Sequence, residues 1–444
     1  MKRLSVVGLG KLGLPLAVFF ASRGFEVIGV DIKAETIKAV NEKKCMFFEP
    51  GIGDLLKNSG DALIATDDYQ YAIQNSEATF IVVSTPSEES GAFSTALIES
   101  ACNKIAKSLK HKKGYHLIVL VSTVIPGSTE RVKQLLEKVS TKKCGRDFGL
   151  CYNPEFIALG DILNGFAKPN FILIGESDPK SGELLAGIFT KACENNPPIL
   201  RTNFYNAELG KILINSYVTM KISFANSMAE MCEKIPGGDV DVLSQILGLD
   251  PRVGRRFLTG GLSYGGPCFP RDNKAVSYFA QTIGIDAKLA NTTYEVNCDQ
   301  IKRVVELVNE KTGEVKGKKL AILGLTYKPN TDIVEESAAL KIAQALVQRG
   351  ARLSVYDPTG SDNTQKVLGR SVQYTNSVQQ CLKGAGLCII ATPWEEFKKL
   401  NPEDFSQNMS KPVLLDCWRI LDRAEFSDKL QYFAVGLGSC LASF

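Results

Sequence analysis

Histidine is almost absent from the 444-residue chain, which has only His111 and His116, five residues apart in a basic stretch. Histidine is the commonest general acid or base. Because it is scarce here, we expect lysine, aspartate, glutamate, tyrosine or cysteine to carry out any proton transfer. The chain also lacks any C-x-x-C pair, although it has twelve cysteines. Scattered cysteines are typical of reduced thiols in a cytosol, so the sequence predicts a cytoplasmic protein without a disulfide scaffold, zinc site or other metal site.

The sequence shows no excess of one charge and no apolar run long enough to span a bilayer. Its 52 basic and 48 acidic residues give a formal net charge of +4, which is too balanced to indicate a nucleic-acid or membrane partner. Lys11 interrupts the apolar N-terminal segment and no cleavage site follows, so we expect no signal peptide. The length and the 44% hydrophobic content suffice for two or three domains.

The chain does contain a strand, Gly-rich turn, helix and strand pattern within residues 3–31. Three later apolar runs end at Thr85, Thr123 and Glu155, and each is apolar on both faces, as buried parallel strands are. Ligands of open parallel sheets bind beyond the carboxyl ends of the strands. We therefore expect these three positions to face one crevice.

A long helix and a second α/β region follow. Residues 206–235 predict one helix of roughly 45 Å, which is more typical of a spine between domains than of a helix within one. After residue 310 the opening plan recurs, with strands predicted near residues 318–324 and 351–357 and a helix near 336–348. The Gly triplet is missing from this second turn, so we expect the two halves to bind different ligands.

The first turn carries the motif of a dinucleotide site. Gly8, Gly10 and Gly13 form G-x-G-x-x-G after a strand and at a helix start, and Asp31 ends the next strand. The glycines allow a tight turn and close approach of a pyrophosphate, and the acid accepts hydrogen bonds from a ribose. Asp31 would repel a ribose 2′-phosphate, which favours NAD over NADP. The alternative is a glycine-rich turn that binds nothing.

Cys268 stands in the stretch "GGLSYGGPCFPRDNKA", two residues before Pro270, which predicts a helix start. The helix dipole and the nearby Arg271 and Lys274 favour a thiolate, which is the nucleophilic form. A cysteine in such a sequence context can equally be inert.

On the long helix, Lys211 and Asn215 are four residues apart and share a face, as a solvated polar stripe would. Asp272 follows Cys268 by one helical turn. It could hold a water or a lysine, or it could serve the helix dipole as a first-turn acid.

Six segments together resemble the UDP-glucose/GDP-mannose dehydrogenase family in order and spacing. They are "VVGLGKLGLPLA", "VSTVIPGST", "YNPEF", "NAELGKILINSY", "GGPCFPRDNKA" and "LGLTYKPNTD". The resemblance implies an α/β fold with two Rossmann-like doubly wound domains joined by a long central helix and a helical dimerisation region. It implies an NAD-binding domain at 1–200, a central domain at 201–300 that carries the catalytic lysine and cysteine, and a sugar-nucleotide-binding domain at 301–444.

The resemblance implies a four-electron oxidation of a sugar C6 alcohol to a carboxylate with two NAD. In it, Cys268 would capture the aldehyde as a thiohemiacetal that is oxidised to a thioester. Lys211 would act as acid/base or stabilise the oxyanion, and Asn215 would donate to the same oxygen. A thiolate forms such an adduct without histidine, which agrees with the composition. The substrate would be UDP-glucose, a UDP-N-acetylhexosamine or GDP-mannose.

Further roles carried over from the family concern positioning and binding. Thr123 and Glu155 would position water and substrate, and Glu155 or Asp272 would help hydrolyse the thioester. Arg252 would reach the sugar nucleotide across the interface of a homodimer. The implied cofactor-binding residues are Gly8, Gly10, Lys11, Leu12, Gly13, Asp31, Thr85, Pro86, Ser122, Thr123 and Arg271. The implied substrate-binding residues are Glu155, Phe156, Lys211, Asn215, Arg252, Tyr264, Gly265, Tyr327 and Lys328.

Four positions depart from the family pattern. Leu159 stands where many relatives have a second glutamate, and Glu335 stands where an arginine commonly faces NAD. Either the loss of the one residue compensates for the loss of the other, or the two losses alter NAD binding. Pro267 replaces the commoner serine beside the nucleophile. Trp418 takes the usual arginine position, although Arg419 follows it directly. The last two changes concern the substrate more than the chemistry.

Two other functions fit the same residues. One is a two-electron NAD dehydrogenase that uses Lys211 as base and has a structural Cys268, and it would yield one NADH per substrate. The other is a catalytically inactive sugar-nucleotide-binding homologue, and it would bind the sugar nucleotide without NAD.

Overall fold

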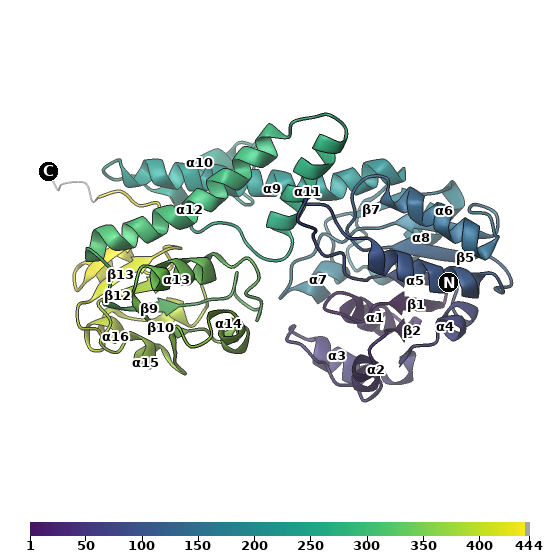
Figure 1. The fold of residues 1–444 in the computed structure, drawn as a ribbon, viewed down its shortest axis with the longest axis horizontal. Helices are drawn as coiled ribbons and strands as arrows, with labels where there is room; N and C mark the ends of the chain where they lie inside the picture. Colours follow the sequence, from purple (N-terminus) through teal and green to yellow (C-terminus); the bar gives the residue numbers. More distant parts are fainter. Residues whose placement is uncertain (440–444) are drawn as a thin grey trace. The chain divides into compact units, whose positions relative to one another are not determined.

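The computed structural model describes residues 1–439 and divides into two compact units (Figure 1). One unit comprises Met1–Ile214 and Tyr278–Gly284, and the other comprises residues 215–277 and those from 285 onward. Each unit is built on a largely or wholly parallel sheet covered by helices. No helix among the described residues is long and apolar enough to cross a membrane.

The first unit contains an eight-stranded sheet in the order β3-β2-β1-β4-β5-β6-β7-β8, in which β7 and β8 are parallel to each other and run opposite to the first six strands. The strands are β1 (Arg3–Val7), β2 (Glu26–Val30), β3 (Leu63–Thr66), β4 (Ala78–Ile81), β5 (His116–Leu120), β6 (Phe148–Tyr152), β7 (Ile172–Glu176) and β8 (Ile199–Thr202). The first six follow the 3-2-1-4-5-6 order of dinucleotide-binding sheets. β4, β5 and β6 are parallel neighbours, so Thr85, Thr123 and Glu155 follow the same edge of the sheet.

Side-chain alternation along these strands places a core on each face of the sheet. In β5, Leu117 and Val119 join one core, while Ile118 and Leu120 join the other. The first core includes residues of α1, α2, α3, α7 and α8, and the second includes residues of α4, α5 and α6. The helices are α1 (Gly13–Ser22), α2 (Ala34–Asn41), α3 (Ile52–Asn58), α4 (Tyr69–Asn75), α5 (Ala96–Leu109), α6 (Ser128–Ser140), α7 (Ile162–Ala167) and α8 (Pro179–Ala192), with a 3-10 turn η1 at Gly60–Ala62.

The basic stretch around the two histidines is only partly solvated. The Lys112 ammonium donates to the carbonyl oxygens of Ile73, Gln74 and Ser76 at 2.7–2.9 Å. His116 is fully buried in β5, where its Nε2 lies 2.7 Å from Thr79 Oγ1. Burial lowers the pKa of His116 to about 3, so this histidine is neutral at physiological pH.

Helix α9 (Phe204–Glu233) confirms the long helix predicted from the sequence, two residues earlier at each end. Its first turn contributes Phe204 and Ala207 to a core of the first unit. Its later turns contribute Ala225, Met228 and other residues to a core of the second unit. The helix therefore joins the two α/β regions, as predicted.

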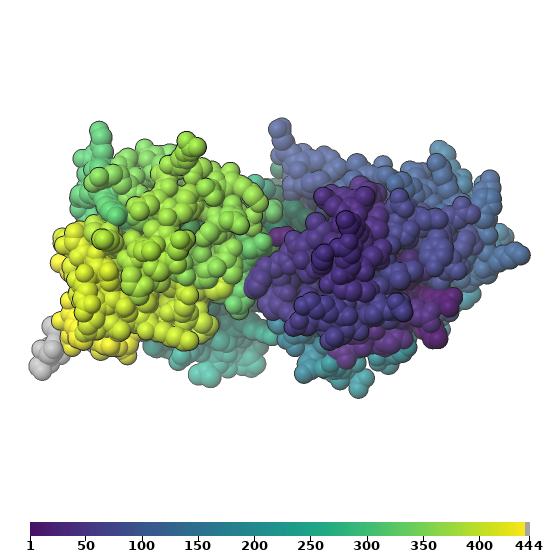
Figure 2. All heavy atoms as spheres, turned by 90° about the horizontal axis from the view of Figure 1, so that it is seen from below, coloured from purple at the N-terminus to yellow at the C-terminus, as the bar shows by residue number. Residues whose placement is uncertain are grey.

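The second unit contains a six-stranded, wholly parallel sheet in the order β11-β10-β9-β12-β13-β14, which repeats the order of the first six strands. The strands are β9 (Lys319–Leu323), β10 (Arg352–Tyr356), β11 (Gln373–Tyr374), β12 (Leu387–Ile390), β13 (Val413–Asp416) and β14 (Gln431–Ala434). This confirms the predicted pair of Rossmann-like domains. Figure 2 shows the residues of this region, in green to yellow, packed as a continuous body.

Helices cover both faces of the second sheet. One core includes residues of α9, α12 and α13, and the other includes residues of α15, α16 and α17. The helices after α9 are α10 (Val240–Leu249), α11 (Phe269–Thr282), α12 (Lys288–Thr312), α13 (Ala338–Gln348), α14 (Ser361–Leu368), α15 (Val378–Leu382), α16 (Pro402–Ser406) and α17 (Arg423–Ser427), with a 3-10 turn η2 at Phe397–Lys399. The predicted helix start at Pro270 is confirmed, because Pro270 is the second residue of α11.

Candidate active site

The glycine-rich turn between β1 and α1 has the geometry that a dinucleotide requires. Gly8 has φ +93°, and a Cβ there would lie 2.5 Å from the Val82 carbonyl oxygen. A Cβ at Gly13 would lie 1.8 Å from the Gly8 carbonyl oxygen, so neither position tolerates a side chain. At Gly10, a Cβ would meet no heavy atom of the described chain within 4 Å. The backbone at Gly10 is therefore open to the close approach of a phosphate, as NAD needs.

Asp31 follows β2 and lies beside this turn. Its Oδ2 accepts a hydrogen bond from Leu9 N at 2.8 Å, and its Oδ1 accepts one from Lys33 N at 2.9 Å. Each carboxylate oxygen keeps a further lone pair for a ribose hydroxyl. With Lys11 and Leu12 in the turn itself, this group of residues fits NAD.

Hydrogen bonds join the loops that follow β4 and β5. Thr85 Oγ1 donates to the Thr123 carbonyl oxygen at 2.9 Å, and Ser122 Oγ donates to the Val83 carbonyl oxygen at 2.7 Å. The Pro86 carbonyl oxygen accepts from Ser94 N at 2.9 Å. The four predicted positions Thr85, Pro86, Ser122 and Thr123 thus lie on two loops that are fixed to each other and to the strand edge.

Lys211 lies on α9 next to the loop after β6. Its Nζ donates to the Glu155 carbonyl oxygen at 2.9 Å and lies 4.8 Å from the centre of the Phe156 ring. The residue is only 7% exposed, which excludes the solvated polar stripe that the spacing alone allowed. The fold brings this lysine next to Glu155 and Phe156, two other residues that the resemblance assigns to the site.

The Glu155 carboxyl group is in an apolar environment. Its Oε1 atom is buried and has no hydrogen-bond partner among the described residues. Burial raises the pKa of Glu155 to about 7, and the nearby Lys211 charge opposes part of that rise. A carboxyl group of this kind exchanges a proton near neutral pH, as a general acid or base must.

Glu208 is a buried acid of this region that sequence reasoning missed. It lies on α9, one turn before Lys211, and its carboxylate accepts from Gly127 N and Thr129 N at 2.6 Å each. These two amides belong to the N-terminus of α6, so Glu208 satisfies backbone donors that the helix itself leaves unpaired. The only sequence signal was an acid within the segment "NAELGK".

In the second unit, Cys268 immediately precedes α11 and is exposed. Its carbonyl oxygen accepts from Asp272 N at 2.8 Å, which places Asp272 one turn into the helix. Asp272 is fully buried, and its carboxylate accepts from Asn215 Nδ2 at 2.6 Å and from Arg271 Nε at 3.2 Å. Asn215 is 8% exposed, so it too is not part of a solvated stripe. The fold thus joins four of the predicted residues within the second unit.

The segment before Cys268 packs closely against the loop after β9. A Cβ at Gly265 would lie 2.2 Å from the Glu336 carbonyl oxygen, and one at Gly266 would lie 2.6 Å from the Tyr327 ring. Gly266 has φ +79°, and its N–H donates to the Glu335 carbonyl oxygen at 3.2 Å. Only glycine fits these two positions. The predicted residues Tyr264, Gly265, Tyr327 and Lys328 therefore belong to two adjacent segments of the second unit.

Two of the positions that depart from the family pattern, Pro267 and Trp418, lie in or against the segment that leads to Cys268. Pro267 lies in the turn at 266–268, where its ring restricts the backbone next to the cysteine. Trp418 packs its ring on Gly261 and donates from Nε1 to the Ala391 carbonyl oxygen at 2.9 Å. Arg419 pairs with Asp241 at 2.7 Å and also donates to the Gly260 carbonyl oxygen.

The remaining departures and Arg252 lie on the surface or at the edge of a core. Leu159 packs at the edge of a core of the first unit, and the Glu335 side chain is exposed. The Arg252 side chain is 86% exposed and pairs with Asp250 at 2.6 Å. Nothing within the described chain explains why an arginine is needed at that position.

The second sheet has an acid at the position that matches Asp31. Asp357 follows β10, and its carboxylate accepts from the backbone amides of Leu325, Thr326, Thr359 and Gly360 at 2.6–3.0 Å. The residue is buried. Its oxygens stabilise the protein's own loops, which agrees with the prediction that the two halves bind different ligands.

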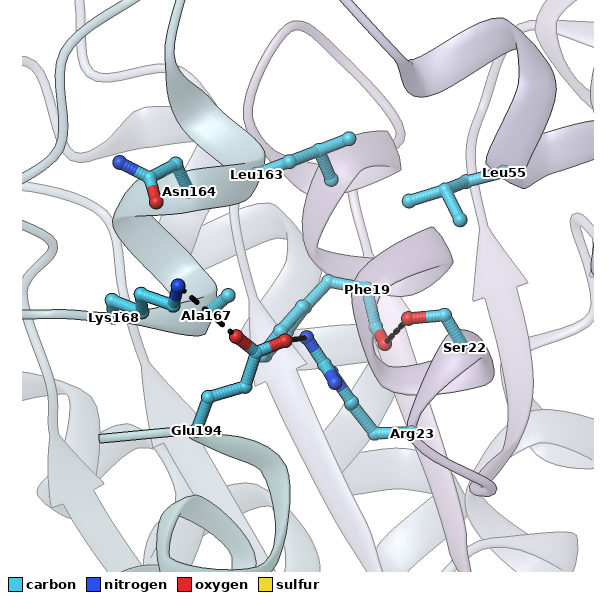
Figure 3. Close-up of a pocket in the computed structure, with 9 residues that line it drawn as sticks. All are labelled: Phe19, Ser22, Arg23, Leu55, Leu163, Asn164, Ala167, Lys168 and Glu194. Carbon is cyan, nitrogen blue, oxygen red and sulfur yellow. Dashed lines mark hydrogen bonds and ion pairs between the residues drawn. The ribbon is translucent and has the colours of Figure 1, made fainter. Parts of the chain in front are cut away.

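A hollow of about 450 Å³ lies near the C-terminal end of α1, away from the glycine-rich turn (Figure 3). Its wall includes Phe19, Leu55 and Leu163, and its two cations are already paired. Glu194 binds Arg23 at 2.5 Å and Lys168 at 3.6 Å. The hollow contains none of the predicted site residues.

Models of the UDP-glucose/GDP-mannose dehydrogenase family match three consecutive segments of the chain. The NAD binding domain matches residues 2–193, the central domain residues 205–299 and the UDP binding domain residues 321–423. The chain belongs to this family. It is accordingly an NAD-dependent oxidoreductase of the nucleotide-sugar dehydrogenase class, as the resemblance of its motifs predicted.

Individual members of the family are similar over nearly the whole chain. The UDP-glucose 6-dehydrogenase AglM of Haloferax volcanii is 34% identical over 96% of this chain and 98% of its own. The UDP-glucose dehydrogenase of Pyrobaculum islandicum superposes with a TM-score of 0.90 at 32% identity, over 98% of both chains. The UDP-D-ManNAc dehydrogenase of Pyrococcus horikoshii gives a TM-score of 0.85 at 27% identity, over 98% of this chain and 99% of its own.

Proposed function

We propose that this dehydrogenase oxidises the C6 alcohol of a nucleotide sugar to the carboxylate and that Cys268 carries the covalent intermediate. The observation that carries the proposal is an exposed thiol at the start of α11, one turn before a buried Asp272 that Asn215 and Arg271 hold in place. The overall reaction converts one alcohol, two NAD⁺ and one water into a carboxylate, two NADH and three protons. NAD supplies the hydride acceptor in both oxidations.

The first part of the reaction requires a base for the alcohol and a nucleophile for the aldehyde. Lys211 is buried and hydrogen-bonded, so its ammonium or amine is held in one position near Glu155. In the proposed mechanism it exchanges the proton of the sugar oxygen, and Asn215 donates to that oxygen. The Cys268 thiolate then adds to the aldehyde carbon and forms a thiohemiacetal.

The second part of the reaction requires water to attack the thioester. Loss of the second hydride leaves the C6 carbon bonded to Sγ as a thioester, and hydrolysis breaks this C–S bond and returns the thiolate. We assign the removal of the water proton to Glu155, because its raised pKa of about 7 suits a base that works near neutral pH. Thr123 would hold the water and substrate in position.

We propose UDP-glucose as the first substrate to test. The support is that the relatives at 30–34% identity are named UDP-glucose 6-dehydrogenases. A UDP-N-acetylhexosamine and GDP-mannose remain the alternatives, because structurally similar enzymes act on other nucleotide sugars. By resemblance to the family, Glu155, Phe156, Tyr264, Gly265, Tyr327 and Lys328 would contact the substrate.

We also propose the functional division into 1–200 for NAD, 201–300 for the catalytic centre and 301–444 for the sugar nucleotide. The three family matches support these limits. We further propose a cytoplasmic homodimer. Apolar side chains on the outer faces of α9 and α10 support the dimer, because they are exposed in the single chain: Tyr217, Phe224, Met231, Val242, Ile246 and Leu249.

The proposal is tested by incubating UDP-, GDP- and dTDP-sugars with NAD and by following absorbance and product mass. We expect two NADH for each UDP-sugar consumed and a uronic acid as product. Replacing Cys268 by serine should stall the reaction after one hydride, with an aldehyde-level product. Full turnover by the serine variant would exclude the covalent role, and a yield of one NADH would favour the two-electron dehydrogenase.

A further inference from the structure

Part of the segment that leads to Cys268 is buried although it has no regular secondary structure. Residues 250–268 join α10 to α11 without a helix or strand, and within them Gly260 to Tyr264 are buried. Backbone amides and carbonyls that are buried must find hydrogen-bond partners, because an unpaired one loses its hydrogen bonds to water without replacement. A helix or strand would supply them, but here they come from side chains.

Three side-chain amides supply these partners. Asn226 on α9 accepts from Gly261 N at 2.9 Å and donates to the Leu262 carbonyl oxygen at 3.3 Å. Asn297 on α12 accepts from Tyr264 N at 2.8 Å and donates to the Tyr264 carbonyl oxygen at 3.1 Å. Gln300, also on α12, donates from Nε2 to the Gly261 carbonyl oxygen. We call Asn226, Asn297 and Gln300 the amide clamp.

The chemistry of the amide explains why these residue types are used. Each amide presents a donor and an acceptor together, so it pairs with a backbone as a neighbouring strand would. It carries no net charge, so it holds the segment without placing an ion near the thiol. The clamp residues are buried on two long helices that share a core, and Arg303 donates to Gln300 Oε1 at 3.0 Å. The clamp is therefore itself held rigidly.

The path from the clamp to the thiol leaves the backbone little freedom. Cys268 is four residues after Tyr264, and the intervening Gly265 and Gly266 are fixed by close contacts with Glu336 and Tyr327. Pro267 restricts one more backbone angle. The position of the segment at Gly261–Tyr264 thus sets where the Cys268 backbone emerges at the start of α11.

We propose that the amide clamp of Asn226, Asn297 and Gln300 positions Cys268 for capture of the aldehyde. This inference rests on the proposed role of Cys268 as nucleophile. A thiol that is displaced even slightly attacks the aldehyde more slowly, because covalent capture needs a near-attack geometry. The aldehyde then has time to leave, and the sugar departs after the first oxidation only.

The test measures how many NADH form per sugar consumed, together with free aldehyde trapped by a hydrazine reagent. Asn297→Leu and Gln300→Met should lower kcat about tenfold or more, change the KM for NAD less than threefold, and release trappable aldehyde with fewer than two NADH per sugar. Asn226→Asp keeps the acceptor for Gly261 N and should lie between these variants and the unaltered enzyme. A role confined to folding would lower kcat and leave the ratio at two.

Asn41→Leu is the matched control. Asn41 contacts one backbone residue in the same reciprocal way, donating to the Ala65 carbonyl oxygen at 2.9 Å and accepting from Ala65 N at 2.8 Å. Its loss should leave the ratio at two. If Asn297→Leu does not fold, Gln300→Met, which loses the hydrogen bond to the Gly261 carbonyl and the one from Arg303, gives the same measurement.

The outcomes separate the two proposals. Folded clamp variants that keep a ratio of two, without trapped aldehyde, overturn the clamp. An unaltered enzyme that yields one NADH, or a Cys268→Ser variant with full turnover, overturns the proposed function instead.

Discussion

At the scale of the residue, the Glu155 carboxyl group combines a buried oxygen with a nearby cation, since Lys211 donates to the backbone carbonyl of the same residue. Its raised pKa comes mainly from the cost of placing a charge in an apolar site, and the Lys211 charge reduces that cost only in part. In the unfolded chain the carboxyl would ionise near its ordinary pKa of 4.5. The folded state thus favours the protonated acid between roughly pH 4.5 and 7.

This pKa predicts the acid side of the pH–rate profile. If the Glu155 carboxylate removes the water proton, kcat should rise as pH increases through about 7 and not near 4.5. Glu155→Gln should lower kcat by about 100-fold, within the range of general-base catalysis. It should also abolish the rise of kcat with pH, which is the acid limb of the profile. Stopped-flow measurement of both NADH phases across pH 5–9 checks the prediction. An unchanged limb in the glutamine variant would assign it to another group.

The same variant has an expected effect on stability. Because the folded pKa is raised, the stability that Glu155 contributes is present below pH 4.5 and is lost as pH rises through about 7. Glu155→Gln removes this dependence, so the difference in thermal midpoint between the two proteins should grow from pH 5 to pH 8.

At the scale of the element, helix α9 is held in place by Glu208, a residue outside the proposed catalytic set. Glu208 binds two amides at the N-terminus of α6, and one turn later Lys211 binds the loop after β6. The helix is thus fixed to two neighbouring loops of the first unit. The direction of the Lys211 side chain depends on this arrangement.

Removing the Glu208 carboxylate should therefore affect both stability and chemistry. Glu208→Ala leaves two buried backbone N–H groups without an acceptor, at a cost of about 1–3 kcal/mol for each. We expect a thermal midpoint several degrees lower and a decreased kcat. Glu208→Gln keeps one acceptor oxygen and should lose about half as much stability. Differential scanning calorimetry measures the first effect, and equal midpoints for the alanine variant and the unaltered protein would exclude the role.

Sequence patterns predicted the elements of this site better than its contacts. The G-x-G-x-x-G turn, the three strand ends at Thr85, Thr123 and Glu155, and the long helix each have a local signature. By contrast, Asn226 contacts backbone 35 residues away at Gly261, and Asp272 contacts Asn215 across 57 residues. No local pattern records such contacts, because only the assembled fold brings the partners together. The burial of Lys211 and Asn215 was hidden for the same reason.

At the scale of the whole molecule, the proposed homodimer would place Arg252 of one chain at the substrate of the other. Two variants, Arg252→Ala and Cys268→Ser, should each form no uronic acid. When both are coexpressed, mixed dimers contain one site with an intact arginine and an intact cysteine, and activity should return to about a quarter of that of the unaltered enzyme for a random mixture. Sedimentation velocity confirms the dimer. Failure of complementation in proven mixed dimers would place Arg252 within its own chain.

The two sheets share a strand order but differ in the use of the acid after the second strand. Asp31 keeps lone pairs for a ribose, whereas Asp357 is occupied by four backbone amides of its own unit. Among the described residues, one Gly-rich turn and its acid thus fit a nicotinamide nucleotide, whereas the proposed reaction reduces two NAD⁺. The first NADH must then leave and a fresh NAD⁺ enter before the sugar is released. The thiohemiacetal would keep the half-oxidised sugar bound to Cys268 while NADH is replaced by NAD⁺. The lifetime of this adduct on the enzyme would therefore depend on the concentration of NAD⁺.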